Sequence, residues 1–145
     1  MTQEHLSFVQ KYLEEKYRTT VFDNFFDFKI VELKEGKAVY NVKIDKKHTN
    51  IYGFVHGGVF ATICDVVMGV SCITLGKLIV TLDMNLSYIK NVPSGNLLTA
   101  VGEVISSGNT IMRASSEVYC DQQLLVKAQA TYFITGEFSS NLDQI

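Results

Sequence analysis

The sequence predicts an α+β domain in which antiparallel strands surround one long helix. Residues 57–75 form an almost wholly apolar segment of helical length that carries a single carboxylate, Asp65. Most of the remaining chain consists of strand-like runs bounded by turn residues. A sheet of such strands with one apolar helix packed inside it is typical of the α+β class.

The length of 145 residues predicts one domain, 1–145, with a sizeable hydrophobic core. We expect the core over about 22–135, preceded by an amphipathic helix over 3–17 and followed by a polar tail at 136–145. The apolar residues of the first helix recur on one side: Leu6, Val9 and Leu13.

Turn residues such as Gly, Asn, Asp and Pro delimit the predicted strands. Five strands are expected at 25–33, 38–44, 97–106, 110–120 and 124–135. A sixth, 78–90, shows the cleanest alternation of apolar and polar residues. Its predicted apolar face consists of Leu78, Val80, Leu82, Met84, Leu86 and Tyr88, and its polar face of Thr81, Asp83, Asn85 and Ser87.

The segment His56-Gly57-Gly58 stands where the long apolar helix should begin, after a polar loop that contains Asn50. The first N–H groups of a helix have no intrahelical partner, and the helix dipole makes this end favourable for anions. Glycines there let a ligand carbonyl approach the backbone closely. The helix start therefore resembles an oxyanion hole, which suits acyl chemistry.

Asp65 follows Gly57 by eight residues, which places it about 12 Å further along the helix axis. One carboxylate side chain cannot span that gap, so both groups of one chain should not act on the same carbonyl. Two copies of the helix packed about a twofold axis would bring Gly57 of one subunit to Asp65 of the other. If both residues are catalytic, the sequence predicts a dimer with shared sites.

Each of these features also has a structural interpretation. His56 is a candidate helix cap, the two glycines a candidate turn, and Asp65 a candidate buried hydrogen-bonding residue. Cys64 has no partnered base in the sequence, which favours packing over a nucleophilic role. The histidines and cysteines lack the spacing of metal ligands.

Composition excludes several classes of protein. A net charge of -2 without a Lys/Arg cluster gives no electrostatic footprint for nucleic acid. Asp65 in the middle of the apolar segment favours a buried helix over membrane insertion. Acidic residues and the lack of a long apolar stretch near the N-terminus argue against a secretory signal. Three unpatterned cysteines are expected to be free thiols in a reducing cytoplasm.

Asn50, Gly53, His56-Gly57-Gly58, Asp65 and the run 81–85 together resemble the hotdog-fold thioesterases of the phenylacetate-pathway (PaaI-like) type. The similarity runs over about 22–135. It implies an antiparallel sheet wrapped around one long central helix, and hydrolysis of an acyl-CoA thioester to free acid and CoA. It implies no metal or redox cofactor.

The resemblance assigns roles to individual residues. Asp65 matches the acidic residue that acts as general base on water or as nucleophile, and Gly57 the residue whose N–H polarises the thioester carbonyl. Asn50 and His56 match residues that bind this carbonyl and shape the site, and Thr81 matches a position that orients the water. Substrate contacts are expected from Gly58, Phe54, Phe60 and Met68, although the last three could equally fill the core.

The expected partners are the acyl-CoA substrate and further copies of the chain, in a homodimer or homotetramer with sites at the subunit interface. The CoA nucleotide has no obvious basic cluster to receive it. Lys77, Lys90 and Arg113 are candidates, and ordinary surface charges otherwise. Two alternatives remain open: a non-catalytic acyl-CoA-binding hotdog module, and a hotdog dehydratase or hydratase. Turnover of any acyl-CoA separates the binding module from the thioesterase.

Overall fold

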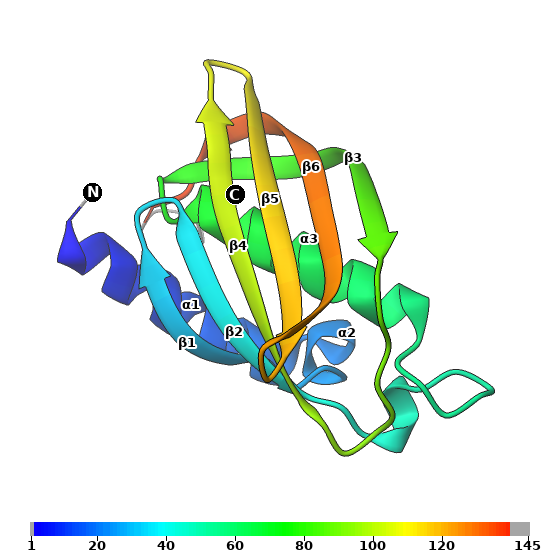
Figure 1. Ribbon diagram of the computed structural model, residues 1–145. Helices are drawn as coiled ribbons and strands as arrows, with labels where there is room; N and C mark the ends of the chain where they lie inside the picture. Colours follow the sequence, from blue (N-terminus) through cyan, green and yellow to red (C-terminus); the bar gives the residue numbers. More distant parts are fainter. Residues whose placement is uncertain (1, 140–145) are drawn as a thin grey trace.

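The computed structural model describes residues 2–139, which form a six-stranded antiparallel sheet around a central helix (Figure 1). The sheet order is β1-β2-β4-β5-β6-β3, so β1 and β3 are the edge strands. This arrangement confirms the predicted fold class. The elements are α1 Gln3–Thr19, α2 Val21–Asn24, β1 Lys29–Lys34, β2 Lys37–Lys43, the 3-10 turn η1 Lys46–His48, α3 Gly57–Ile73, β3 Lys77–Tyr88, β4 Leu97–Ser107, β5 Ile111–Cys120 and β6 Gln123–Glu137.

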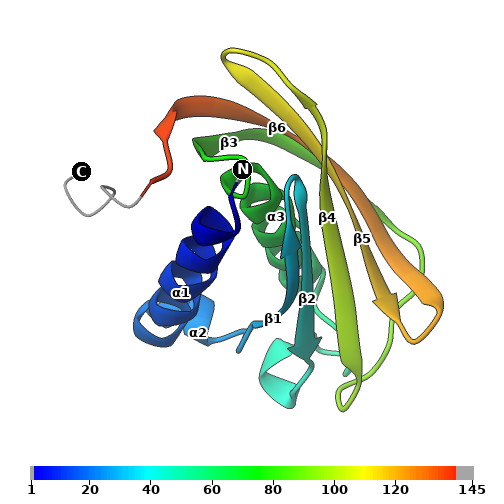
Figure 2. The ribbon, with the colours of Figure 1, turned by 90° about the vertical axis from the view of Figure 1, so that its left-hand side faces the viewer.

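The helix α3 lies in the concave face of the sheet, and α1 lies beside it (Figure 2). Ten of its seventeen residues are buried, because its apolar character extends around most of its circumference. The contact is closest at Gly102 of β4, where any Cβ would overlap the carbonyl of Val67. None of the helices in residues 2–139 has the length and hydropathy needed to cross a membrane.

The N-terminal helix begins and packs as its sequence predicts. Thr2 caps α1 by accepting a hydrogen bond from the N–H of His5 at 3.2 Å. Val9 and Leu13 are buried, and Leu6 is partly buried. The His5 ring reaches the last turn of α3, where Nε2 lies 3.2 Å from the carbonyl oxygen of Ile73. The helix thereby closes one side of the groove in which α3 lies.

The segment before β1 differs from the prediction of a strand over 25–33. A short helix, α2, occupies Val21–Asn24, and the strand begins only at Lys29. Asp27 takes a left-handed φ of 49°, which interrupts an extended chain at this point. The aromatic run Phe25–Phe28 packs its rings against one another and against the core instead of pairing in the sheet.

The predicted two-faced alternation of β3 is wrong in its first half. The register with β6 shifts twice, between Leu78 and Ile79 and between Thr81 and Asp83. An extra residue in one strand reverses the face of everything beyond it. Val80 and Leu82 are therefore about half exposed, at 50% and 54%, instead of sharing the core face with Met84.

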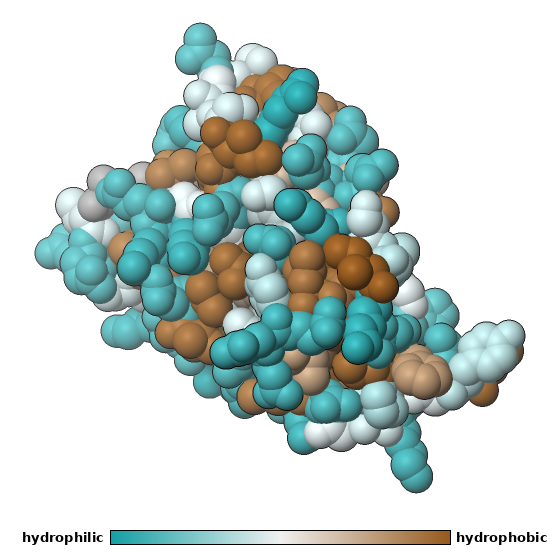
Figure 3. All heavy atoms as spheres, in the orientation of Figure 1, coloured by the Kyte–Doolittle hydropathy of each residue, from teal (hydrophilic) through white to brown (hydrophobic). Residues whose placement is uncertain are grey.

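The bulge at Leu82 also separates Thr81 from the two polar residues that were expected on its face. Thr81 points toward α3, where its hydroxyl contacts Asp65. Asp83 and Asn85 instead line a shallow depression on the outer face of the sheet, together with Arg113 and Gln129. Figure 3 shows this outer face as mostly polar, with separate apolar groups among the polar ones.

The last strand continues beyond its predicted end at residue 135. It ends at Glu137, and Phe138 is buried against the rings of Phe8 and Tyr12 on α1. The first residues of the expected polar tail therefore belong to the folded domain. The remainder of that tail, 140–145, lies outside the described residues.

Candidate active site

The first turn of α3 presents a backbone donor at its start. His56 is the N-cap residue, and its Nδ1 accepts a hydrogen bond from the N–H of Gly58 at 2.9 Å. The next two N–H groups donate to the carbonyl of His56. The N–H of Gly57 has no acceptor among residues 2–139. One donor at the positive end of the helix dipole thus remains available for a ligand.

A tyrosine from β3 lies beside this donor. The hydroxyl of Tyr88 donates to the carbonyl oxygen of Gly57 at 2.9 Å. A Cβ at position 57 would lie 3.5 Å from that hydroxyl oxygen, at ordinary van der Waals contact, so side chains larger than alanine would meet Tyr88. The sequence pattern predicted Tyr88 only as a residue on the apolar face of a strand. The structure shows that it fixes the peptide that follows the free amide.

Asp65 lies in the third turn of the same helix and is partly buried. Its Oδ1 accepts two hydrogen bonds, one from the hydroxyl of Thr81 at 2.9 Å and one from the hydroxyl of Tyr132 at 3.0 Å. Its Oδ2 accepts none from the described part of the chain. One oxygen is therefore held by the sheet while the other is left to act on a ligand.

Tyr132 is the site residue that the sequence did not reveal. It lies on β6, is 1% exposed, and also places its hydroxyl 3.0 Å from the backbone oxygen of Asp65. Burial, followed by the nearby charge of Asp65, raises the pKa of Tyr132 well above its ordinary value, so this hydroxyl stays protonated and donating. In the sequence it is one aromatic residue of an alternating strand, which predicts only a core position.

The structure does not bring Gly57 and Asp65 of one chain together. Both lie on one uninterrupted helix, Gly57–Ile73, at a separation of about two turns or 12 Å. The separation of Gly57 and Asp65 that the sequence predicted is therefore present in the fold. Neither group alone can both polarise a carbonyl and attack it.

Asn50 organises the loop that precedes the helix. Its Oδ1 accepts hydrogen bonds from the N–H groups of Tyr52 at 2.9 Å and Phe54 at 3.2 Å. Gly53 completes the turn with a left-handed φ of 82°. Only the amide nitrogen of the Asn50 side chain remains to meet a substrate, so this residue has a clear structural role in addition to any catalytic one.

The four predicted substrate contacts fall in different environments. Phe60 and Met68 are 1% and 0% exposed and belong to the hydrophobic core, which was the alternative to substrate contact for these residues. Phe54 is 42% exposed and its backbone bridges to Pro93. Gly58 is exposed in the first turn of α3, where it lines a cavity.

Cys64 precedes Asp65 in sequence but points about 100° away from it around the helix axis. Its side chain is fully buried, and burial raises the pKa of its thiol to about 11. A protonated, enclosed thiol is a poor nucleophile, which supports the packing interpretation. Within residues 2–139, no group of three or more His, Cys, Asp or Glu side chains is placed to hold a metal ion.

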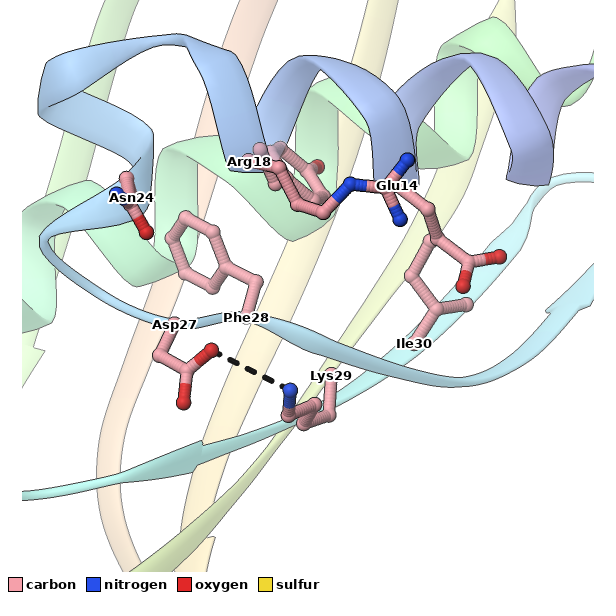
Figure 4. Close-up of a pocket in the computed structure, with 8 residues that line it drawn as sticks. Glu14, Arg18, Asn24, Asp27, Phe28, Lys29 and Ile30 are labelled. Atoms are coloured by element: carbon pink, nitrogen blue, oxygen red, sulfur yellow. Dashed lines mark ion pairs between the residues drawn. The ribbon is translucent and has the colours of Figure 1, made fainter.

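A second hollow lies between α1, α2 and β1, away from these residues (Figure 4). Its volume is about 200 Å³. Acidic Glu14 and Asp27 share its wall with Arg18 and Lys29, and Asp27 pairs with Lys29 at 3.3 Å. The opposite charges largely neutralise one another, so the hollow offers no strong attraction for a charged ligand.

Comparison with known proteins agrees with this geometry. The family model for the thioesterase superfamily matches residues 52–127, which is more than half of the chain. A hypothetical thioesterase protein from Streptococcus pneumoniae, whose structure contains coenzyme A, is 31% identical and superposes with a TM-score of 0.75 over 77% of this chain and 91% of that one. Human acyl-coenzyme A thioesterase 13 is 30% identical over 91 residues, which are 61% of this chain and 65% of the human protein.

The Escherichia coli PaaI protein has the same fold with little sequence similarity. It superposes with a TM-score of 0.81 over 90% of this chain and 95% of its own, at 18% identity. The family match covers the helix that carries Gly57 and Asp65 together with β3, β4 and β5. The chain therefore belongs to the thioesterase superfamily and is a thioester hydrolase with the hotdog fold.

Proposed function

We propose that this protein hydrolyses acyl-CoA thioesters, with Asp65 and Gly57 from two different subunits at each site. The observation that carries the proposal is that one helix presents two functional groups. Its first N–H has no acceptor, and its carboxylate has one oxygen fixed by hydrogen bonds and one oxygen free. The similar streptococcal thioesterase, whose structure holds coenzyme A, supports CoA as the carrier of the acyl group.

In the proposed reaction, the thioester carbonyl oxygen accepts a hydrogen bond from the N–H of Gly57. The free Oδ2 of Asp65 takes a proton from a water molecule, whose oxygen attacks the carbonyl carbon. The negative charge then resides on the carbonyl oxygen, facing the Gly57 amide and the helix dipole. Collapse of this intermediate breaks the carbon–sulfur bond, and the CoA sulfur receives the proton from Asp65.

Direct attack by Oδ2 on the carbonyl carbon is the second mechanism that this geometry allows. It would form an acyl–Asp65 anhydride, which water then hydrolyses. A single turnover in H₂¹⁸O detects the anhydride mechanism when water attacks the aspartyl carbon of the anhydride. Attack by water places ¹⁸O in the released acid alone, whereas hydrolysis of an anhydride at its aspartyl carbon places ¹⁸O in Asp65.

The other site residues have supporting roles in this proposal. Thr81 and Tyr132 orient Asp65 by donating to Oδ1. The side-chain nitrogen of Asn50 adds a second donor to the substrate carbonyl. His56 fixes the first turn of α3 through Nδ1, which accepts the hydrogen bond from the N–H of Gly58.

A second subunit is required because the two functional groups lie about 12 Å apart on one helix. The edge strand β3 offers a surface for it, since its twelve residues are paired on one side only and its exposed side chains include Val80 and Leu82. We propose a homodimer, or a tetramer of two such dimers, in which antiparallel α3 helices face each other.

The direct test is release of free CoA from a panel of acyl-CoA thioesters by the purified protein, followed with a thiol reagent. We expect turnover of at least one thioester, and loss of that turnover in Asp65→Asn. Binding of acyl-CoA without any thiol release would identify a binding module instead. Hydration of an enoyl-CoA without thiol release would identify a hydratase.

A further inference from the structure

A mostly apolar cavity of about 380 Å³, whose wall also includes Lys47, Thr49 and Thr62, opens beside the first turn of α3. One wall consists of Phe22, Phe25 and Phe26, from α2 and the residues that follow it. The facing wall comes from the first two turns of α3 and includes His56 and Gly58, the two residues that flank Gly57. The residues on either side of the free amide therefore contribute to the cavity wall.

The aromatic wall is tied rigidly to the amide. His48 is 1% exposed, and its Nε2 lies 2.7 Å from the carbonyl oxygen of Phe25. The backbone oxygen of His48 accepts the N–H of His56 at 2.9 Å. One buried residue thus links the phenylalanine segment to the N-cap of α3. The cavity and the donor at Gly57 should move as one unit.

The surroundings of Gly57 differ in chemistry. Its own nearest side chain is Tyr88, whereas its neighbours His56 and Gly58 line the phenylalanine cavity. A thioester carbonyl bound at the Gly57 amide has two substituents, an acyl group and a CoA arm that carries amides and phosphates. An apolar acyl group gains from burial among the phenylalanine rings. Amides or phosphates of the CoA arm would find partners in this wall only at its polar residues, Lys47, Thr49, His56 and Thr62.

We propose that this cavity is the acyl-binding subsite, and that it selects apolar acyl groups longer than acetyl. The proposal rests on the proposed thioesterase function and names its substrate class. Phe22 is the wall residue best suited to test it, because its side chain is 61% exposed and contributes little to the core. Its ring packs edge-on against Phe26, with centroids 5.3 Å apart.

The experiment measures kcat/KM for straight-chain acyl-CoA substrates from two to eight carbons. Each methylene that enters the cavity should raise kcat/KM of the wild type about fourfold, the factor that corresponds to burial of one methylene. Phe22→Ala should lower the value for the longest substrates roughly tenfold and leave acetyl-CoA within about twofold. Val21→Ala is the matched control, since Val21 is adjacent, 88% exposed and outside the cavity wall.

A second variant and a second leaving group make the result decisive. Phe22→Trp should reduce the room for long acyl groups and move the preference toward shorter ones. The loss in Phe22→Ala should be the same for acyl-CoA and for the corresponding acyl-N-acetylcysteamine, which lacks the nucleotide. A loss confined to the CoA substrates would assign the cavity to the CoA arm and overturn the proposal.

The outcomes also separate this proposal from the proposed function. Hydrolysis by the wild type with equal effects of Phe22→Ala on acetyl-CoA and octanoyl-CoA would refute the acyl subsite and leave the thioesterase intact. Absence of thiol release from every substrate would refute the thioesterase itself. Binding of an octyl-CoA thioether, which cannot be hydrolysed, then still reports on the cavity through its dependence on Phe22.

Discussion

The first and third turns of α3 hold their functional groups in different ways. At Gly57 the donor is a backbone amide, the flanking His56 and Gly58 are exposed, and a short loop leads into the helix. At Asp65 the acceptor is a side chain, fixed by hydroxyl groups from two strands of the sheet. The contrast suggests that the first turn admits substrate and the third turn sets the geometry of attack.

The most severe loss should follow from removing the charge in the third turn. Asp65→Asn keeps the shape of the side chain and its oxygen acceptor, but it removes the base or nucleophile. We expect kcat to fall by about 10²–10⁴-fold, the usual contribution of a positioned general base. Circular dichroism and thermal unfolding should resemble the wild type. Activity within threefold of the wild type would show that the third turn has no chemical role.

The requirement for both turns can be tested across subunits. Gly57→Val adds a branched side chain next to the amide and against Tyr88, whose hydroxyl a Cβ would already contact at 3.5 Å, and we expect it to obstruct carbonyl binding at the amide. Mixing this variant with Asp65→Asn should restore activity that neither has alone. Random pairing makes half of the dimers mixed, each with one of two sites intact, so about a quarter of wild-type activity is expected. Subunit exchange proven by mass spectrometry without any recovery would contradict shared sites.

The sequence predicted the first turn better than the third for a physical reason. His56, Gly57 and Gly58 are adjacent in the chain, and helix-start chemistry depends on such local order. The contacts of Asp65 come from residues 16 and 67 positions away. Tyr132 looks like any core aromatic until the sheet is assembled. The long α3 helix, the strands and the turns were likewise predictable from local patterns.

Errors of prediction have the same origin. The bulge in β3 depends on how β3 pairs with β6, and it moved Asp83 and Asn85 to the outer face. At the short helix α2, the rings of Phe22, Phe25 and Phe26 pack against one another, and these residues do not pair in the sheet. In both regions tertiary packing overrode the local pattern: it changed the faces of residues in the first half of β3, and it delayed the start of β1 to Lys29.

A smaller effect is expected from the hydroxyl that only positions Asp65. Tyr132→Phe removes one hydrogen bond to Oδ1 while Thr81 retains the other, so kcat should fall about three- to tenfold with KM nearly unchanged. Thr81→Ser, which retains the second donor to Oδ1, should not reproduce this loss. A purely structural role of Tyr132 would lower thermal stability in Tyr132→Phe without lowering kcat of the folded protein.

Tyr88→Phe and Thr81→Ser are the matched comparisons for that result. Tyr88 is 57% exposed, so water can replace its hydrogen bond to Gly57, and the loss of kcat should be smaller than for Tyr132→Phe. Thr81→Ser retains the hydroxyl that donates to Oδ1 and should keep most activity. A larger loss of kcat in Tyr88→Phe than in Tyr132→Phe would show that the first turn, and not the third, sets the geometry of attack.

The smallest effect on activity should come from Cys64, which is adjacent to Asp65 in sequence but outside the site. At pH 8 a thiol with a pKa of about 11 is almost entirely protonated, and the side chain is fully buried. Iodoacetamide should therefore leave turnover of the folded protein unchanged, whereas the denatured chain should be alkylated at this residue. Rapid inactivation at pH 8, with Cys64 as the modified residue, would place the thiol in the reacting centre.

The same burial predicts how stability depends on alkaline pH. Burial raises the thiol pKa of both Cys64 and Cys72 from 9.0 to about 11, so the folded chain retains these protons at pH values where the unfolded chain releases them. Their contribution is fully present below pH 9 and is lost as pH rises toward 11. Denaturant unfolding should accordingly give a lower free energy of unfolding at pH 10 than at pH 8. In Cys64→Ala the decrease should be smaller, since one of the two thiols no longer titrates, and an unchanged decrease in that variant would assign the alkaline loss to other groups.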